Sequence, residues 1–151
     1  MRSSRLAAAT LLAIGAALAL AGCSPVVVLD PAPDANNPAC ADVIVRLPQT
    51  LQGLDRRETD AQATGAWGDP TAVLLRCGVE VPVASTLTCE NVDGIDWLLE
   101  PGEGGTRTFT SFGRDPAIDV VIDSDAVSPG LVLSDLSFMV GFTPTNGLSC
   151  E

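Results

Sequence analysis

The sequence contains no histidine, no lysine and no tyrosine, and aromatic residues make up only 4% of it. Without histidine or lysine, the chain cannot build a Ser–His–Asp or Cys–His nucleophilic site, nor the Ser–Lys variant. Only Asp and Glu remain as general acids or bases. A glycosidase needs two carboxyl groups about 5 to 9.5 Å apart, and the spacing of the acidic residues selects no such pair. We therefore expect a protein that is not an enzyme.

Basic residues are also scarce, because eight arginines face 19 acidic residues and give a formal net charge of −11. Nucleic-acid binding depends on Lys and Arg side chains that neutralise phosphates. Anionic lipid likewise attracts basic segments. The composition therefore argues against a nucleic-acid partner and against electrostatic binding to a membrane surface.

The N-terminus has the pattern of a bacterial lipoprotein signal. Two arginines precede an apolar run over 6–21, which is shorter than the roughly 20 residues of a membrane-spanning helix. The run ends in the letters LAGC, in which two small residues precede a cysteine that can take diacylglycerol on its thiol. We predict a signal peptide over 1–22 and lipidation of Cys23. The alternative is a plain secretory signal with an incidental cysteine.

The five cysteines fit this interpretation, since lipid on Cys23 leaves an even set of four. In an oxidising compartment, four cysteines form two disulfides by default. Three connectivities are possible; proximity in the sequence favours Cys77–Cys89, which leaves Cys40–Cys150. Zinc and related metals favour imidazole and thiolate ligands. With every thiol consumed and histidine absent, we expect no metal and no other cofactor.

The chain divides into three predicted parts. The signal peptide over 1–22 is followed by the lipidated cysteine and a proline-rich stretch over 23–37. Extended proline-rich chain of this length would act as a tether of about 40 Å; a first strand at 25–29 is the alternative. Residues 38–151 form one extracytoplasmic domain.

Two helices and several strands are expected in this domain. Asn37-Pro38 and Ser128-Pro129 have the cap-plus-proline pattern of helix starts. The first helix ends before Pro48. For the last part of the second helix, a strand over 137–142 is the alternative. Alternating or apolar runs predict strands at 71–83, 94–99, 106–113 and 117–123, and a short one near 56–59. The order predicts an α+β fold, with an antiparallel sheet of about four to five strands, an N-terminal and a C-terminal helix packed on it, and two disulfides.

Two stretches rich in glycine, proline and aromatic residues hold the candidate binding residues. In one interpretation Trp67 and Arg76 line a ligand pocket, with the guanidinium as an anion clamp; in the other a buried tryptophan fixes a turn. An acidic stretch over 119–125 lacks the residue order of an EF-hand calcium loop. The possible binding surface comprises Trp67, Asp69, Arg76, Trp97 and Arg114. The carboxylates considered for catalysis are Asp69, Asp96, Asp115, Asp119 and Asp123.

Several motifs in fixed order resemble one known family. They are the segment from Cys40 to Leu47-Pro48, Arg56-Arg57, Trp67-Gly68-Asp69-Pro70, Arg76-Cys77-Gly78, Cys89, Gly94-x-x-Trp97 and Phe109-Thr110-Ser111-Phe112-Gly113-Arg114-x-Pro116-Ala117. Over about 38–150 the sequence resembles the actinobacterial lipoproteins and membrane-anchored proteins catalogued as domain of unknown function 3515. The resemblance implies a secreted, lipid-anchored protein of the envelope of high-GC Gram-positive bacteria. It implies no activity and no catalytic residues.

The function expected from the sequence is therefore that of a non-catalytic binding or interaction module. It would be held by the lipid on Cys23 at the extracytoplasmic face of the cell membrane, with an envelope protein or glycan as its partner. The alternative is a carboxylate-based hydrolase of an envelope glycan or ester. Two facing carboxyl groups in a cleft would favour the enzyme, whereas a shallow surface with exposed aromatic side chains would favour the binding module.

Overall fold

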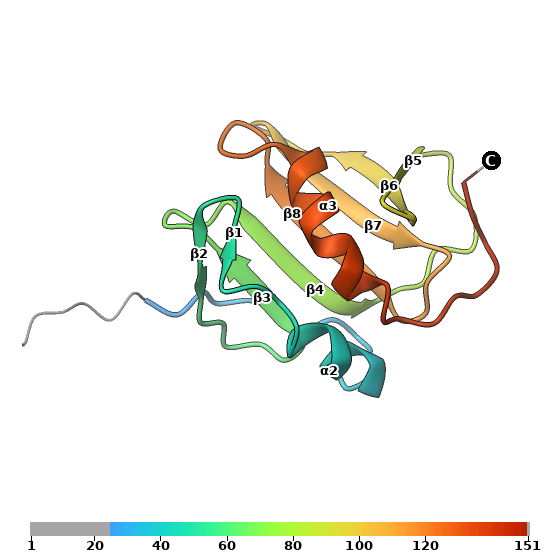
Figure 1. Cartoon of the computed structure of the whole chain (residues 1–151), viewed down its shortest axis with the longest axis horizontal. Helices are drawn as coiled ribbons and strands as arrows, with labels where there is room; N and C mark the ends of the chain where they lie inside the picture. Colours follow the sequence, from blue (N-terminus) through green and yellow to red (C-terminus); the bar gives the residue numbers. More distant parts are fainter. Residues whose placement is uncertain (1–24, 151) are drawn as a thin grey trace, which may run out of the picture.

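The computed structural model of the chain describes residues 25–150, so the predicted signal peptide and the lipidation of Cys23 lie outside the described residues. Eight antiparallel strands form one sheet in the order β1-β2-β3-β4-β8-β7-β6-β5. Helix α3 lies across one face of this sheet, and helix α2 lies beside strand β4 (Figure 1). The elements are α2 (Pro38–Ile44), β1 (Thr50–Leu51), β2 (Leu54–Arg57), β3 (Thr64–Trp67), β4 (Val73–Val79), β5 (Thr88–Val92), β6 (Ile95–Pro101), β7 (Thr106–Phe112), β8 (Ala117–Asp123) and α3 (Pro129–Val140).

Both helices begin where the sequence predicts. The Asn37 side chain accepts a hydrogen bond of 3.0 Å from the backbone N–H of Ala39, and a proline occupies the first turn of each helix. Such a cap satisfies one of the amides that a helix leaves free at its N-terminus. Helix α3 continues to Val140, which excludes the alternative strand over 137–142.

The four main predicted strands are confirmed as β4, β6, β7 and β8, and the short strand near 56–59 overlaps β2. The expected number of strands was too low. Strand β3 contains a glycine and two other small or polar residues, and the edge strand β5 is largely polar and exposed. These strands form because paired neighbours complete their backbone hydrogen bonds, rather than from the preferences of their own side chains. The result is still an α+β fold.

The hydrophobic core lies between the helices and one face of the sheet. Alternate residues of β4 and β8 point to this face, and all of them are fully buried. The opposite set points away from the helices and includes Arg76 and Asp119, which lie directly across from each other on β4 and β8. The inward residues of these two strands are Val73, Leu75, Cys77, Ile118, Val120 and Ile122, and helix α3 adds Val132, Leu133, Leu136 and Val140.

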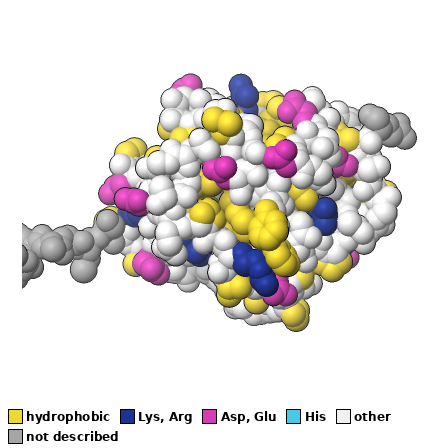
Figure 2. Space-filling model, viewed as in Figure 1, with side chains coloured by type: hydrophobic (Ala, Val, Ile, Leu, Met, Phe, Trp, Pro, Cys, Tyr) yellow, Lys and Arg dark blue, Asp and Glu magenta, His cyan; other side chains and the backbone are white. Residues whose placement is uncertain are grey.

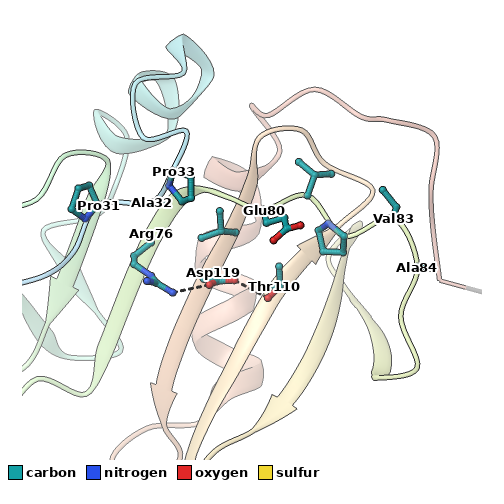
Figure 3. A pocket seen from close by; sticks show the side chains of 12 residues that line it. Pro31, Ala32, Pro33, Arg76, Glu80, Val83, Ala84, Thr110 and Asp119 are labelled. Atoms are coloured by element: carbon teal, nitrogen blue, oxygen red, sulfur yellow. Dashed lines mark hydrogen bonds and ion pairs between the residues drawn. The ribbon is translucent and has the colours of Figure 1, made fainter.

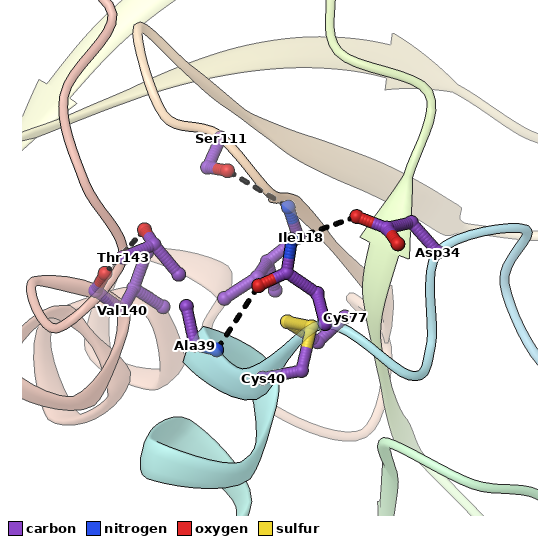
Figure 4. The surroundings of a disulfide bond; sticks show 9 residues. Asp34, Ala39, Cys40, Cys77, Ser111, Ile118, Val140 and Thr143 are labelled. Atoms are coloured by element: carbon purple, nitrogen blue, oxygen red, sulfur yellow. Dashed lines mark hydrogen bonds between the residues drawn. A yellow bond between two sulfur atoms is a disulfide. The ribbon is translucent and has the colours of Figure 1, made fainter.

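The disulfides join Cys40 to Cys77 and Cys89 to Cys150, so the predicted pairing was wrong. Cys77 lies on β4 and Cys89 on β5, and three strands separate these two in the sheet. At about 4.8 Å per strand they are roughly 19 Å apart, whereas a disulfide needs Cα atoms within about 7 Å. The observed Cα–Cα distances are 5.6 and 5.7 Å. Figure 4 shows the first bond between α2 and β4, beside Ile118.

The proline-rich stretch also differs from its prediction, because most of it packs on the domain instead of extending as a tether. Val27 pairs with Thr59 in a parallel bridge, and the backbone N–H of Asp34 donates to the carbonyl of Gly78 at 2.9 Å. Gly78 has a φ of 92°, and a Cβ there would collide with the backbone of Asp34. The stretch 25–29 therefore makes an edge pairing, which is close to the alternative prediction of a first strand there. The prolines that follow lie over the sheet.

Candidate functional site

The structure does not bring the five predicted binding residues together. Trp67 and Trp97 are both fully buried in the core, as their structural interpretation required. The indole N–H of Trp67 donates to the carbonyl of Pro48 at 3.0 Å. This contact ties β3 to the loop after α2, so Trp67 holds the fold and offers no surface to a ligand.

Replacing Trp67 by alanine tests this assignment. Truncation of a buried tryptophan leaves a large cavity and costs about 3–5 kcal/mol of unfolding free energy, and here it also removes the hydrogen bond to Pro48. We expect Trp67→Ala to lower the urea midpoint strongly. Phe138→Ala is the matched control: its ring is mostly exposed, so its midpoint should stay within experimental error. Equal midpoints for the two variants would contradict the assignment.

Asp69 and Arg114 have partners within the described residues. The exposed Asp69 carboxylate lies 3.4 Å from the Arg57 guanidinium. Arg57 itself is largely buried and donates to the carbonyls of Gly68 and Pro25 at 2.9 and 2.7 Å. Sequence reasoning noted Arg57 only as part of a motif, since its role depends on residues that are distant in the chain. Arg114 donates to the carbonyl of Thr143 at 2.9 Å and fixes the turn after α3.

Arg76 lies on the floor of an open hollow on the sheet face that the helices leave uncovered (Figure 3). Its guanidinium bonds the Asp119 carboxylate at 3.0 Å, and the Thr110 hydroxyl donates to the other oxygen of the same carboxylate at 2.7 Å. This sheet hollow has a volume of about 530 Å³, with Pro31 and Pro33 on one side and the loop after β4 on the other. The three polar side chains form a ladder across β4, β8 and β7.

Two carboxyl groups lie at the sheet hollow, those of Asp119 and Glu80. Asp119 is only 13% exposed, and each of its oxygens already has a partner. Glu80 lies at the rim of the hollow, on the loop after β4. Arg76 and Thr110 occupy one carboxylate oxygen of Asp119 each.

Two of the other carboxylates considered for catalysis, those of Asp96 and Asp123, also have partners within the domain. Asp96 accepts hydrogen bonds from the Asn91 amide and from the backbone N–H of Cys150, at 2.6 and 2.9 Å. Asp123 accepts from the backbone N–H of Asp125 at 3.0 Å. Over residues 25–150, no group of three or more acidic or cysteine side chains has an arrangement that could hold a metal ion. Within the same residues, no helix has the length and hydropathy to cross a bilayer.

A different surface carries exposed aromatic side chains, at the C-terminal end of helix α3. Phe138 is 72% exposed and Phe142 is 40% exposed, and their rings meet edge to face with centroids 5.3 Å apart. The guanidinium of Arg46 lies over the Phe142 ring, 4.1 Å from its centroid. We call Arg46, Phe138 and Phe142 the aromatic patch. Figure 2 shows hydrophobic side chains gathered at the surface in this region, with basic side chains against them.

The aromatic patch borders a second hollow, of about 530 Å³. Asp93 also lines it and accepts a hydrogen bond from the Ser134 hydroxyl. Arg114 also lines it, so one predicted binding residue does lie beside this surface. We call this cavity the patch hollow. It combines apolar ring surface with a carboxylate and a guanidinium.

Sequence reasoning missed the aromatic patch although a signal for it exists. The helical spacing of Val132, Leu136, Met139 and Val140 defines the inward face of α3, and all four are buried. Phe138 falls outside that face, so its exposure was implied by the same spacing. Phe142 lies just beyond the helix, where periodicity no longer fixes direction. The signal was an aromatic residue on the outward side of the helix, away from the buried positions.

Comparison with known proteins gives a family and no activity. A family model described as "Protein of unknown function (DUF3515)" matches residues 5–145. No curated protein matches the chain, and no solved structure does so either. The match covers nearly the whole sequence, including all of the sheet and both helices. The chain therefore belongs to the DUF3515 family of proteins of unknown function.

Proposed function

We propose that the protein is an actinobacterial lipoprotein that serves as a non-catalytic binding module of the cell envelope, with the aromatic patch as its contact surface. Lipid on Cys23 holds it at the extracytoplasmic face of the membrane. The lipoprotein signal and the even set of four paired cysteines support this location. The exposed pair Phe138 and Phe142 supports the binding role.

The exposure of this pair is the observation that carries the proposal. The chain has only four phenylalanines and two tryptophans, and both tryptophans are buried. A protein so poor in aromatic side chains nevertheless leaves two of them in water, packed on each other. Exposed apolar surface of this kind marks interaction sites, and aromatic side chains dominate the binding energy of interfaces.

The net charge of the whole chain, rather than the charge at the aromatic patch, where Arg46 and Arg114 accompany Asp93, favours a protein partner with a basic and apolar contact segment. The chain has a formal net charge of −11, and Asp93 borders the patch hollow. Arg46 over Phe142 shows that the exposed ring already accepts a cation on its face. A partner that packs an apolar side chain against the exposed Phe138 ring and places Lys or Arg near Asp93 would match both features.

A photocrosslinking experiment tests the binding surface. Benzoylphenylalanine at position 138 of the lipidated protein should give one discrete adduct in intact envelopes, because the ring at this position lies in the interface. The same probe at Val83, which is exposed in the loop after β4, should give none. Asp93→Arg should weaken the adduct at position 138 because it repels a basic partner.

Three results would count against the proposal. The first is equal crosslinking at positions 138 and 83. The second is an adduct at 138 that strengthens in the Asp93→Arg variant, which would indicate an acidic partner. The third is an adduct that consists of two copies of this chain. The comparison of positions 138 and 83 is independent of stability, because both side chains lie at the surface.

The hydrolase alternative receives no comparable support. The sheet hollow holds an Asp119 carboxylate that is already paired with Arg76 and Thr110. The shallow surface with exposed aromatic side chains is present instead, and it is the feature that distinguishes the binding module from the enzyme.

A further inference from the structure

The N-terminal end of the described chain is fixed to the domain from Pro25 onward. The Arg57 guanidinium donates to the carbonyl of Pro25 at 2.7 Å. The backbone N–H of Val27 donates to the carbonyl of Glu58 at 2.9 Å, and the carbonyl of Val27 accepts from Asp60 at 3.3 Å. Three bonds over three residues hold this segment as a short strand along the edge of the domain.

Only one residue, Ser24, separates Cys23 from Pro25. Two residues of fully extended chain reach at most about 7 Å, whereas the tether expected over 23–37 would reach about 40 Å. We propose that the domain lies directly against the outer leaflet of the membrane, with its N-terminal edge in contact with lipid. This inference rests on the lipidation of Cys23 in the proposed function.

The side chains at this edge suit contact with a lipid surface. Val26 is 51% exposed and Val28 is 79% exposed, while Val27 between them points inward. Because side chains alternate along extended chain, the two exposed valines share one side, next to the anchor. Exposed apolar side chains gain free energy when they enter the interfacial region of a bilayer. A hollow of about 700 Å³ borders the same edge beside Val26 and Leu54. Its other lining is mostly charged and therefore suits the polar headgroup layer rather than the acyl chains: Asp55, Arg56, Arg57, Glu58 and Asp69.

The position of this edge leaves the aromatic patch accessible. The chain enters the domain at one end of the long axis, and the C-terminus lies at the other (Figure 1). Helix α3 lies between these ends, across the face of the sheet. Membrane contact at the N-terminal edge therefore presents the patch sideways along the leaflet, where a neighbouring envelope protein can reach it.

Depth-dependent fluorescence quenching tests this orientation in the full lipidated protein. A fluorescent amino acid is placed at Val28 or at Val83, and the protein is inserted by its anchor into phosphatidylcholine vesicles with a nitroxide on the headgroup. Neutral lipid avoids repulsion from the acidic domain. We expect the probe at position 28 to lose most of its fluorescence and the probe at position 83 to keep it. Equal and weak quenching at both positions would overturn the inference.

An insertion provides the matched control. Ten Gly/Ser residues between Ser24 and Pro25 add a flexible linker with an end-to-end distance of about 17 Å and change no described residue. Quenching at position 28 should then fall towards that at position 83; unchanged quenching would show that the anchor does not set the distance. Absence of lipid in the mass spectrum, with no vesicle binding at all, would refute the anchor itself and so the proposed function. Normal vesicle binding without quenching at position 28 would refute only the orientation.

Discussion

Removal of the Cys40–Cys77 disulfide should leave a domain that is mostly unfolded or barely stable. In the chain-entropy model, a crosslink across 37 residues stabilises the folded state by about 4 kcal/mol. Both cysteines are fully buried between α2 and β4, so the Cys40→Ala/Cys77→Ala variant also loses core packing. Small domains have only about 5–15 kcal/mol of stability in total. The expected loss of unfolding free energy is therefore comparable to the total stability of the domain.

Urea unfolding of the mature domain measures this effect, with Cys89→Ala/Cys150→Ala as the matched control. The control disulfide spans 61 residues and stabilises the folded state by a similar amount in the chain-entropy model. It links the edge strand β5 to the C-terminal tail, however, and its cysteines are only half-buried. We expect the control to keep the core and unfold at a lower but measurable urea midpoint. Mild reductant should likewise open Cys89–Cys150 first. A lower midpoint for the control than for the Cys40/Cys77 variant would contradict this account.

Loss of the thiol at position 23 should abolish maturation altogether. In the proposed anchor the lipid is attached through the Cys23 sulfur, and the hydroxyl of a serine would not replace it. A Cys23→Ser variant should therefore accumulate as an unlipidated chain of precursor size. Two acyl chains anchor a protein stably, whereas a single chain binds only marginally, and the acidic domain adds no attraction to anionic lipid.

Membrane fractionation and immunoblotting show the outcome, with Ser24→Ala as the control that leaves the thiol in place. The control should appear in the membrane fraction at mature size, like the unchanged protein. A Cys23→Ser chain of mature size in the membrane fraction would show that the anchor lies elsewhere. That result would remove the support for the proposed location.

Local signals in the sequence identified most of the fold. Asn37-Pro38 and Ser128-Pro129 act at the helix ends where they occur, and the β-branched run in 117–123 fits one side of a buried strand. These features depend on neighbours within one or two turns or on alternation along one strand. Properties that depend only on such short distances can be read from the sequence.

Long-range pairing could not be read in the same way. The disulfide prediction placed Cys77 next to Cys89 because they are near in the chain, but β6, β7 and β8 lie between their strands. The stretch over 25–36 has a composition typical of a tether, yet Gly78 lets its backbone pack on the sheet. Both errors arise because sheet order is set by strand pairing, which composition and spacing do not encode.

The candidate site likewise combines features that local sequence predicts with features that depend on long-range pairing. Burial of the two tryptophans agreed with their structural interpretation, whereas the pairing of Arg57 with Asp69 depends on strands that meet only in the folded state. Phe138 could have been identified from its position on the outer side of α3. Its contact with Phe142, and the Arg46 guanidinium over the Phe142 ring, could not be predicted in this way. Both depend on how the turn after α3 and the end of α2 lie relative to each other in the folded domain.

Mass spectrometry of the protein taken from its native envelope, under non-reducing conditions, tests the central claim most directly. The account predicts a chain that begins at residue 23 and carries a diacylglyceryl group on that sulfur, with peptides linked as Cys40–Cys77 and Cys89–Cys150. An unmodified thiol at position 23, or free thiols at the other four positions, would contradict it.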